Sequence, residues 1–370
     1  MTILFRPYGD IAVAPLPRTD ADTALVARIA AALGIAIAQE DEVDYEDWME
    51  PACMLAAALD LGLEIKILPR LPLRQAVSEP LFHIPGQACR DILIGRQHRQ
   101  DPYEIHHLDL GWPAANSNLA NHYGEMASFH RHAGRKLRLA DMPGDAEHAA
   151  GRRPVFALGA TSQSLGAAMR ALAPGAVMVK QVYPAKELPL LSYDLDSEIT
   201  EDDCKRLFID AVGFHFARFE GDPSSLLVQE KITMTHETRF FVIDGKVVTG
   251  AACIEHHTPQ QNPDPDQRLN PIWEIRRNKG EMDTRCITAR QTTAELMLAF
   301  ADRVAQEIAE EAPALRAYTL DVALGADGTP LIIELNPADN AGLYGISAQA
   351  YLRAILAYAQ SVPHRVLESA

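Results

Sequence analysis

The feature that most constrains the fold is a pair of apolar runs on either side of Asp327-Gly328, within residues 317–337 (AYTLDVALGADGTPLIIELNP). Asp-Gly accepts the positive φ values of a type I′ turn, so the segment is predicted to form a β-hairpin with a two-residue loop. This register places Asp321 directly opposite Glu334. The C-terminal part of the chain should therefore contain two antiparallel strands that carry acidic side chains.

Oxygen-bearing side chains on one face of this hairpin predict a metal site. Side chains alternate between the two faces of a strand, so Asp321, Glu334 and Asn336 should share a face. Because like charges directly opposite each other repel, a positive group is expected between the two carboxylates. Mg²⁺ fits, since it binds proteins through one or two carboxylates and fills its other positions with water and substrate phosphates. The alternative is two exposed carboxylates on a solvated sheet face.

Length and charge limit the kind of protein. A chain of 370 residues exceeds the usual size of one domain, and a polar stretch with Pro and Gly at 141–153 predicts a boundary between domains 1–150 and 151–370. Lys and Arg number 34 against 50 Asp and Glu, which gives a net charge of −16. Such a surface repels nucleic acid and anionic lipid, so we expect neither nucleic-acid nor membrane partners.

The cysteines and the longest apolar run favour a cytoplasmic protein. The five cysteines are scattered, odd in number and without a CxxC pair, which is typical of a reducing compartment. The apolar run 24–38 is interrupted by Arg28 and preceded by Asp20 and Asp22, whereas a secretory signal has a basic leader and a membrane span needs about 20 apolar residues. We interpret this run as part of an amphipathic helix.

The first 150 residues are predicted to form a small α/β lobe. Its expected elements are a strand at 3–5, a helix at 22–33, an acidic loop at 41–47, a helix at 51–61 and a strand at 63–68. Residues 71–150 show only a weak pattern of helices and strands. Their histidines could form a metal site, but zinc-type spacing is lacking, so the alternative is that they are solvated or hydrogen-bonded. These histidines are His98, His106, His107, His122, His130 and His132.

Two lysines mark the start of the second half. Lys180 lies in a predicted apolar strand, and Lys186 follows six residues later. Burying an unpaired ammonium group is costly, so each lysine is expected to face a partner, and two lysines around a short turn can hold adjacent phosphate oxygens. The alternative is one edge-strand lysine and one surface lysine. Strands are expected at 155–158, 176–181 and 226–232, and helices at 162–172, 199–217, 288–311 and 347–359.

A second Asp-Gly dipeptide, Asp244-Gly245, predicts another β-hairpin. A two-residue loop places Arg239 opposite Gly250, a small partner that leaves the guanidinium room to reach a ligand. An ordinary strand opening is the alternative. The Pro-rich stretch 255–272 that follows is either a substrate-covering loop or a disordered one.

Taken together, Lys180, Lys186, the VQEKI segment, Arg239, Asp321 and Glu334-Leu335-Asn336 resemble the ATP-grasp superfamily, most closely its clade named for one arginine and two lysines. The order of these residues and their strand context carry the resemblance, which covers about 155–356. It implies an α+β fold in which two subdomains grip ATP, preceded by the smaller α/β lobe.

The resemblance also implies a role for each residue. Lys180 and Lys186 would contact the ATP phosphates, and Arg239 would stabilise the transferring phosphoryl group. Because the segment after Lys180 contains no glycine, Lys186 would replace the usual Gly-rich phosphate loop. The adenine hinge would include Gln229, Glu230 and the backbone of Lys231 and Ile232, with Glu237 at the ribose or beside Arg239, and the Mg²⁺ ligands would be Asp321, Glu334 and Asn336.

The activity implied is an ADP-forming ligation that joins a carboxylate to an amine through an acyl phosphate, on an amino acid, a peptide or a protein terminus. Two alternatives remain open at this point. One is a small-molecule kinase that stops after phosphoryl transfer, and the other is a nucleotide-binding regulatory protein without turnover. The basic residues Arg276, Arg277, His256 and His257 either meet an acidic substrate or balance the acidic surface.

Overall fold

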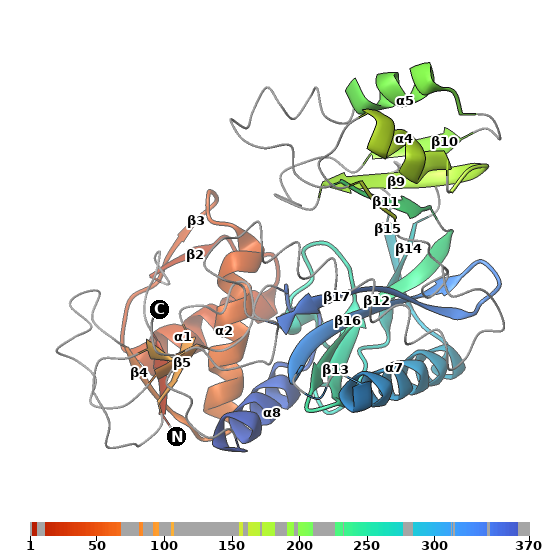
Figure 1. Ribbon diagram of the computed structural model, residues 1–370. Coiled ribbons are helices and arrows are strands. Elements are labelled where there is room, and N and C mark those ends of the chain that lie inside the picture. Colours follow the sequence, from red (N-terminus) through yellow and green to blue (C-terminus); the bar gives the residue numbers. More distant parts are fainter. Residues whose placement is uncertain are drawn as a thin grey trace. The chain divides into compact units, whose positions relative to one another are not determined.

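The computed structural model describes most of residues 2–67 and 226–361, together with shorter segments between them. The described residues are 2–5, 12–67, 81–83, 92–95, 105–106, 155–157, 162–170, 172–181, 191–195, 199–209, 226–231, 233–276, 284–311, 313, 315–338 and 341–361. These residues contain both helices and strands (Figure 1), and the predicted α+β class is confirmed.

The chain divides into two compact units. The first comprises Met1–Trp112, His236–Val322 and Leu335–Ala370, and the second comprises Pro113–Thr235 and Ala323–Glu334. The predicted boundary near residue 150 lies outside the described residues, so the division into 1–150 and 151–370 stays a prediction. The histidine-rich stretch 71–150 lies almost entirely outside them as well.

Two helices of the first unit are fixed by their N-caps. α1 (Asp20–Leu33) begins after Thr19, whose hydroxyl accepts the Asp22 N–H at 3.2 Å while the Asp22 carboxylate accepts the Thr19 N–H at 3.0 Å. α2 (Tyr45–Asp60) begins after Asp44, whose carboxylate accepts the N–H groups of Glu46 and Asp47. A side-chain acceptor at this position satisfies N–H groups that have no partner within the helix.

The sequence-based start of α2 at Pro51 is wrong, because the helix begins at Tyr45 and includes half of the predicted acidic loop. Pro is common in the first helical turn, which made Pro51 a plausible start. It lies instead in the helix interior, where it costs one backbone hydrogen bond. Asp44, Glu46 and Asp47 are therefore the cap and first turn of a helix, where negative charge is favourable.

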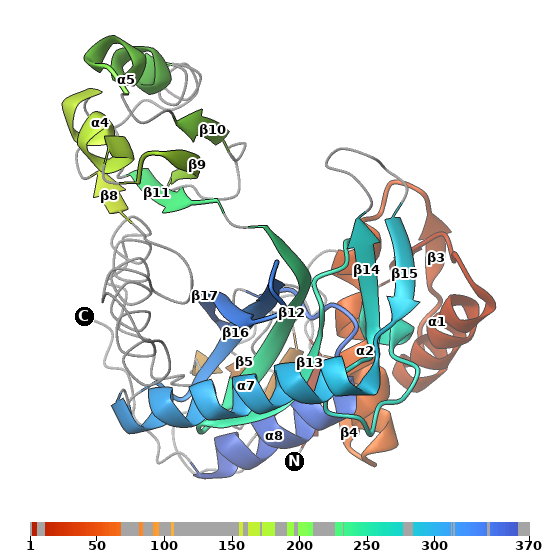
Figure 2. The same ribbon diagram turned by 90° about the vertical axis from the view of Figure 1, so that its right-hand side faces the viewer.

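The main sheet of the chain has the strand order β13-β12-β16-β17. Its strands are β12 (Met234–Ile243), β13 (Lys246–Ala252), β16 (Ala317–Gly325) and β17 (Pro330–Pro337). α7 (Gln291–Glu311) and α8 (Ala348–Ser361) both pack against β13, on the same side of the sheet (Figure 2). α8 also packs against α2, so the core of the first unit joins residues from both ends of the chain.

The remaining strands of the first unit form further sheets, one of them with five short strands. One has the order β4-β1-β6-β5-β7, and β2 pairs with β3 in parallel and β14 with β15 in antiparallel orientation. A short 3₁₀ turn, η3 (Pro259–Gln261), packs against α2. The strands are β1 (Thr2–Phe5), β2 (Val13–Pro15), β3 (Ala38–Glu40), β4 (Glu64–Ile67), β5 (Leu81–His83), β6 (Ile92–Gly95), β7 (Ile105–His106), β14 (Ile272–Arg276) and β15 (Thr284–Thr288).

The second unit contains an antiparallel sheet of order β10-β9-β11-β8 with two helices. Its apolar core includes Leu165, Met169, Val177 and Val179. The elements are β8 (Val155–Ala157), α4 (Ser162–Arg170), β9 (Gly175–Gln181), β10 (Leu191–Leu195), α5 (Glu201–Phe208) and β11 (Leu226–Glu230). The strand predicted around Lys180 is β9, so that prediction is confirmed for the backbone.

The turn between β12 and β13 has the predicted type, but beyond it the residues of the two strands are paired in a different register from the predicted one. Asp244 and Gly245 have φ values of 50° and 69°, as a type I′ turn requires. A β-bulge at Val248 then shifts the pairing, so that Arg239 lies opposite Ala251 and not Gly250. Gly250 instead faces Phe240, whose ring would lie 2.5 Å from a Cβ at that position. A bulge inserts one residue and moves every later pair.

The turn between β16 and β17 contradicts the predicted two-residue loop. Gly325 N–H donates to the Thr329 carbonyl at 2.8 Å and Gly328 N–H donates to the Gly325 carbonyl at 2.9 Å, so residues 326–328 form the loop. Gly328 has a φ of 81°, but Asp327 lacks the positive φ of a type I′ turn. Its carboxylate accepts the Thr329 N–H at 2.9 Å, a bond that stabilises this other turn. The two-residue loop was the reason to expect Asp321 directly opposite Glu334, and that reason no longer holds.

Candidate active site

The centre of the candidate site is an ion pair between neighbouring strands of the main sheet. Arg239 on β12 donates from Nε to Asp321 Oδ1 at 2.8 Å and from Nη2 to Asp321 Oδ2 at 2.7 Å. The side chains are only 11% and 2% exposed. A buried charge is tolerated only when it is paired, and the two parallel bonds fix the plane of the guanidinium as well as its charge.

This pairing determines the charge of the arginine. Burial alone disfavours the charged form, but the Asp321 carboxylate and its hydrogen bonds outweigh that effect and raise the pKa of Arg239 well above its ordinary value. The guanidinium therefore stays positive at every physiological pH. The protein itself thus supplies a positive group beside Asp321. The cation predicted between Asp321 and Glu334 stays a prediction.

The segment Gly342–Tyr344 forms the next layer around Arg239. Arg239 Nη1 donates to the Gly342 carbonyl at 3.5 Å, and the guanidinium carbon lies 5.1 Å from the centroid of the Tyr344 ring, within cation–π range. Tyr344 has a φ of 50°, a left-handed conformation that costs a non-Gly residue about 1–3 kcal/mol. Burial, more than the nearby Cys253, raises the pKa of its hydroxyl, so Tyr344 is neutral.

A carboxyl group of α2 lies behind this segment. Glu50 is 3% exposed, and its Oε1 accepts the backbone N–H of Leu343. Burial raises the pKa of Glu50 to about 7, although the N–H groups of Leu343 and Tyr344 act in the opposite direction. Sequence reasoning missed Glu50 because it precedes Pro51, where the helix was expected to start. Asp44 followed by acidic residues at the first helical turn was the signal for an earlier start.

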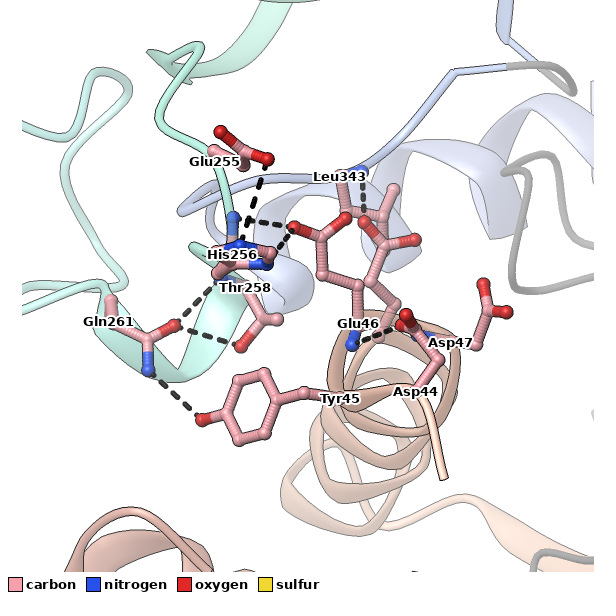
Figure 3. A network of polar contacts seen from close by, with 10 residues as sticks. Asp44, Tyr45, Glu46, Asp47, Glu255, His256, Thr258, Gln261 and Leu343 are labelled. Carbon is pink, nitrogen blue, oxygen red and sulfur yellow. Dashed lines mark hydrogen bonds and ion pairs between the residues drawn. The ribbon is translucent and has the colours of Figure 1, made fainter. Parts of the chain in front are cut away.

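The Pro-rich loop after β13 is fastened to α2 (Figure 3). His256 N–H donates to Glu46 Oε1 at 2.5 Å, and Gln261 Nε2 donates to the Tyr45 hydroxyl at 3.3 Å. Gln261 Oε1 in turn accepts the N–H of Thr258 at 2.7 Å. The loop is therefore ordered, and the prediction that it could be disordered is wrong. Whether it covers a substrate stays a prediction.

The end of the same loop is tied to the segment that follows β17. Asn270 is buried, and its Nδ2 donates to the Gly345 carbonyl at 2.8 Å. Ser347 N–H donates to the Thr249 hydroxyl at 3.0 Å. These bonds anchor the C-terminal end of the segment that surrounds Arg239.

Of the residues predicted for the site, the structure brings Arg239 and Asp321 together. Glu237 is half-buried on β12, near Arg239 in sequence. Lys231, in the second unit, donates from its N–H to the Ala176 carbonyl at 2.7 Å and from Nζ to Ser192 Oγ at 2.9 Å, so this N–H is already used within the sheet. Only the backbone is described for Lys180, Gln229, Glu230, Glu334 and Asn336, and both Lys186 and Ile232 lie outside the described residues.

The predicted Mg²⁺ site is described only in part. Among the described residues, no group of three or more His, Cys, Asp or Glu side chains is arranged to hold a metal ion. Both oxygens of Asp321 accept hydrogen bonds from Arg239, so its charge is already balanced. The fit of Mg²⁺ therefore depends on the side chains of Glu334 and Asn336, and the ligand set stays a prediction.

Comparison with known proteins agrees with the sequence-based resemblance. Residues 210–354, less than half of the chain, match the sequence profile of an ATP-grasp domain. This part of the chain is therefore an ATP-grasp domain, as the resemblance implied. The matching family is family 2 of the clade named for one arginine and two lysines. The match includes Arg239, Asp321 and β17, whereas Lys180 and Lys186 precede it.

Solved ATP-grasp structures are similar only at a low level. D-alanyl-alanine synthetase A from Vibrio cholerae O1 biovar eltor is 14% identical, with 85% of this chain and 93% of that chain covered and a TM-score of 0.45. D-cycloserine synthetase DcsG is 11% identical, with 84% and 94% covered and a TM-score of 0.44. The ATP-grasp ligase PsnB is 19% identical, with 66% and 63% covered and a TM-score of 0.35. All three TM-scores are below 0.5, which is too low to support an inference about this chain.

No curated protein matches the chain. No helix among the described residues is long and apolar enough to cross a membrane.

Proposed function

We propose that the chain is an ATP-dependent ligase that joins a carboxylate to an amine through an acyl phosphate. The observation that supports this proposal is the state of Arg239, a buried guanidinium held in plane by Asp321 and permanently charged, inside the ATP-grasp domain. Phosphoryl transfer needs little covalent chemistry from the protein, because positioning and charge neutralisation supply most of the acceleration.

The geometry of Arg239 leaves donors for a substrate. Contacts among the described residues use Nε–H and one N–H of Nη2 for Asp321, and one N–H of Nη1 for Gly342. A guanidinium has five N–H donors, so one on each terminal nitrogen remains. The side chain is 11% exposed, and we propose that these two N–H groups bind an oxygen of the transferring phosphoryl group.

The reaction we propose has two balanced steps. An oxygen of the substrate carboxylate attacks the γ-phosphorus, the bond from that phosphorus to the bridging oxygen breaks, and ADP leaves. The amine nitrogen then attacks the acyl carbon and loses a proton, the bond to the phosphate oxygen breaks, and inorganic phosphate leaves. Lys180 and Lys186 would hold phosphate oxygens as point charges while Arg239 neutralises charge on the phosphoryl group.

The remaining roles follow the same proposal. Mg²⁺, when bound by Asp321, Glu334 and Asn336, would neutralise charge on the ATP phosphates. Adenine would bind near Gln229, Glu230, Lys231 and Ile232, with Glu237 at the ribose or supporting Arg239. We propose an amino acid, a peptide or a protein terminus as the substrate class, and the cytoplasm as the compartment.

The test combines product analysis with substitution of Arg239. The full chain with Mg²⁺ and ATP is assayed for ADP release over amino acids and short peptides, and the products are identified by mass spectrometry. Arg239→Ala should lower kcat about 1,000-fold because the lost charge acts on the transition state. Arg239→Lys should recover little, since an ammonium group cannot replace a bidentate fork.

Asp302→Asn is the control, because Asp302 on α7 also pairs with an arginine, Arg268, through two bonds but lies nearer the surface. It should leave kcat unchanged. Equal ADP release by wild type and Arg239→Ala would remove Arg239 from the mechanism. A phosphate ester in place of an amide would make the chain a kinase, and ATP binding without ADP formation under any substrate would make it a regulatory protein.

A further inference from the structure

Glu50 is a buried acid that the proposed reaction does not use. It lies on α2, near the N-terminal end of the chain, and is 3% exposed. A charged carboxylate in such a place is expensive, so its presence there calls for a physical reason. The contacts of the Glu50 carboxyl group point to such a reason.

The Glu50 carboxyl group contacts the segment that follows β17. Oε1 accepts the Leu343 N–H, and the Tyr344 N–H acts on the same carboxyl group. Gly342 lies close by, since a Cβ added there would be 3.6 Å from Oε1. The carboxyl group thus fixes the backbone from Gly342 to Tyr344 from one side.

The same segment also contacts Arg239. The Gly342 carbonyl accepts a hydrogen bond from Nη1, and the Tyr344 ring lies under the guanidinium. Glu50 and Arg239 do not need to touch, because Glu50 acts on the N–H groups of Leu343 and Tyr344 while Arg239 contacts the Gly342 carbonyl and the Tyr344 ring. Their positions are therefore linked through Gly342–Tyr344.

The segment needs outside support to keep this shape. Tyr344 has a φ of 50°, a strained conformation for a residue with a side chain. Asn270 anchors the Gly345 carbonyl just beyond it, but on the near side the backbone N–H groups of Leu343 and Tyr344 depend on Glu50. Removing this acceptor would let Tyr344 relax and withdraw the ring and the carbonyl from Arg239.

We propose that Glu50 is a positioning residue for Arg239, and that it acts through the backbone of Gly342–Tyr344. This inference rests on the proposed function for its kinetic consequence but not for its structural one. It assigns a role in the ATP-grasp site to a helix near the N-terminus, outside the matched residues 210–354.

Three variants test the proposal. Glu50→Ala removes the acceptor, Glu50→Gln keeps one carbonyl oxygen for the Leu343 N–H, and Asp47→Asn is the matched control, an exposed acid one turn earlier on α2. The first readout is the hydrogen-exchange rate of the Arg239 Nε–H, followed by ¹⁵N NMR on the full chain. Glu50→Ala should raise this rate about tenfold, Glu50→Gln by less, and Asp47→Asn should not change it.

The second readout is kinetic. Glu50→Ala should lower kcat about tenfold and change KM for ATP less than twofold, because misplacing Arg239 affects the transition state more than substrate binding. In the Arg239→Ala background, Glu50→Ala should have no further effect on kcat, since a residue that acts only through Arg239 has nothing left to position.

The outcomes separate the two proposals. An unchanged Nε–H exchange rate in a folded Glu50→Ala variant would overturn the positioning role, as would independent effects of the two substitutions on kcat. Faster exchange in a chain whose wild type releases no ADP would support the positioning role and overturn the ligase function. A melting curve for each variant, with Glu50→Gln as the milder change, shows that the exchange is measured on folded protein.

Discussion

Asp321 and Glu50 are both buried carboxylic acids of the first unit, but they have opposite kinds of partner. Asp321 faces the guanidinium of Arg239 through two charge-assisted hydrogen bonds. Glu50 faces the backbone N–H groups of Leu343 and Tyr344. Among the described residues no cation contacts it, and the charged groups that act on it are Glu46 and Asp47. Burial raises the pKa of Glu50 to about 7, whereas the Asp321 carboxylate raises the pKa of Arg239 well above its ordinary value.

The difference teaches what each arrangement is suited for. A full opposite charge offsets the cost of desolvation, and the guanidinium of Arg239 then keeps its charge at physiological pH. N–H dipoles offset that cost only in part, so the acid titrates near neutrality. The first arrangement suits a group that must stay charged during phosphoryl transfer, and the second ties the stability of its surroundings to pH.

The largest effect is expected from breaking the ion pair. Asp321→Asn leaves a buried guanidinium without its counter-charge, which should lower the free energy of unfolding by about 3–5 kcal/mol. Urea denaturation at pH 7 measures this loss. The double variant Arg239→Met/Asp321→Leu is the control, because an apolar pair of similar volume often matches a buried ion pair in stability. A loss below about 1 kcal/mol for Asp321→Asn would show that the pair is not effectively buried.

The next effect concerns Glu50 and its dependence on pH. The folded-state pKa of about 7 lies above the ordinary value of 4.5, so the folded protein binds this proton more tightly than the unfolded chain does. The resulting stability is fully present below pH 4.5 and is lost as pH rises through about 7. The loss should be about 3 kcal/mol.

Glu50→Gln checks this sign directly, because its side chain does not titrate. Relative to the variant, wild type should lose stability between about pH 5 and pH 8 in urea titrations. Asp47→Asn should show a smaller loss than wild type, because the Asp47 charge is one of the causes that raise the Glu50 pKa. Parallel curves for wild type and Glu50→Gln would mean that the Glu50 carboxyl group is not desolvated. Glu50→Gln should be more stable than wild type at high pH, although it is also expected to position Arg239 less well.

Much of the fold could be predicted from local sequence patterns. The Asp244-Gly245 turn, the strands around it and the helices α1, α7 and α8 follow from turn residues and apolar periodicity. Arg239 and Asp321 could be selected because charged residues interrupt apolar strands. Their contact could not be derived from the stated register, because the bulge at Val248 and the three-residue turn before Thr329 depend on packing and side-chain hydrogen bonds.

Glu50 could not be identified for a different reason. A glutamate beside a proline in an acidic stretch is typical of a solvated loop, whereas the tertiary packing around α2 leaves Glu50 buried. The same limit applies to Leu343 and Tyr344, which contribute backbone groups and a strained φ rather than a recognisable motif. Roles carried by backbone N–H groups leave no trace in the residue types.

The smallest effect is expected where the same chemical pair lies at the surface. Arg268 and Asp302 also form two hydrogen bonds, one of them at 3.1 Å, but their side chains are 46% and 34% exposed. Water screens this pair and solvates either partner alone, so Asp302→Asn should cost no more than about 1 kcal/mol. The effect should shrink further in about 0.5 M salt, whereas that of Asp321→Asn should not.

Measured side by side in urea, the two substitutions isolate burial as the variable, because both remove one charge from a bidentate arginine pair. Equal losses at the two sites would contradict the claim that burial, rather than geometry, makes the Arg239–Asp321 pair strong.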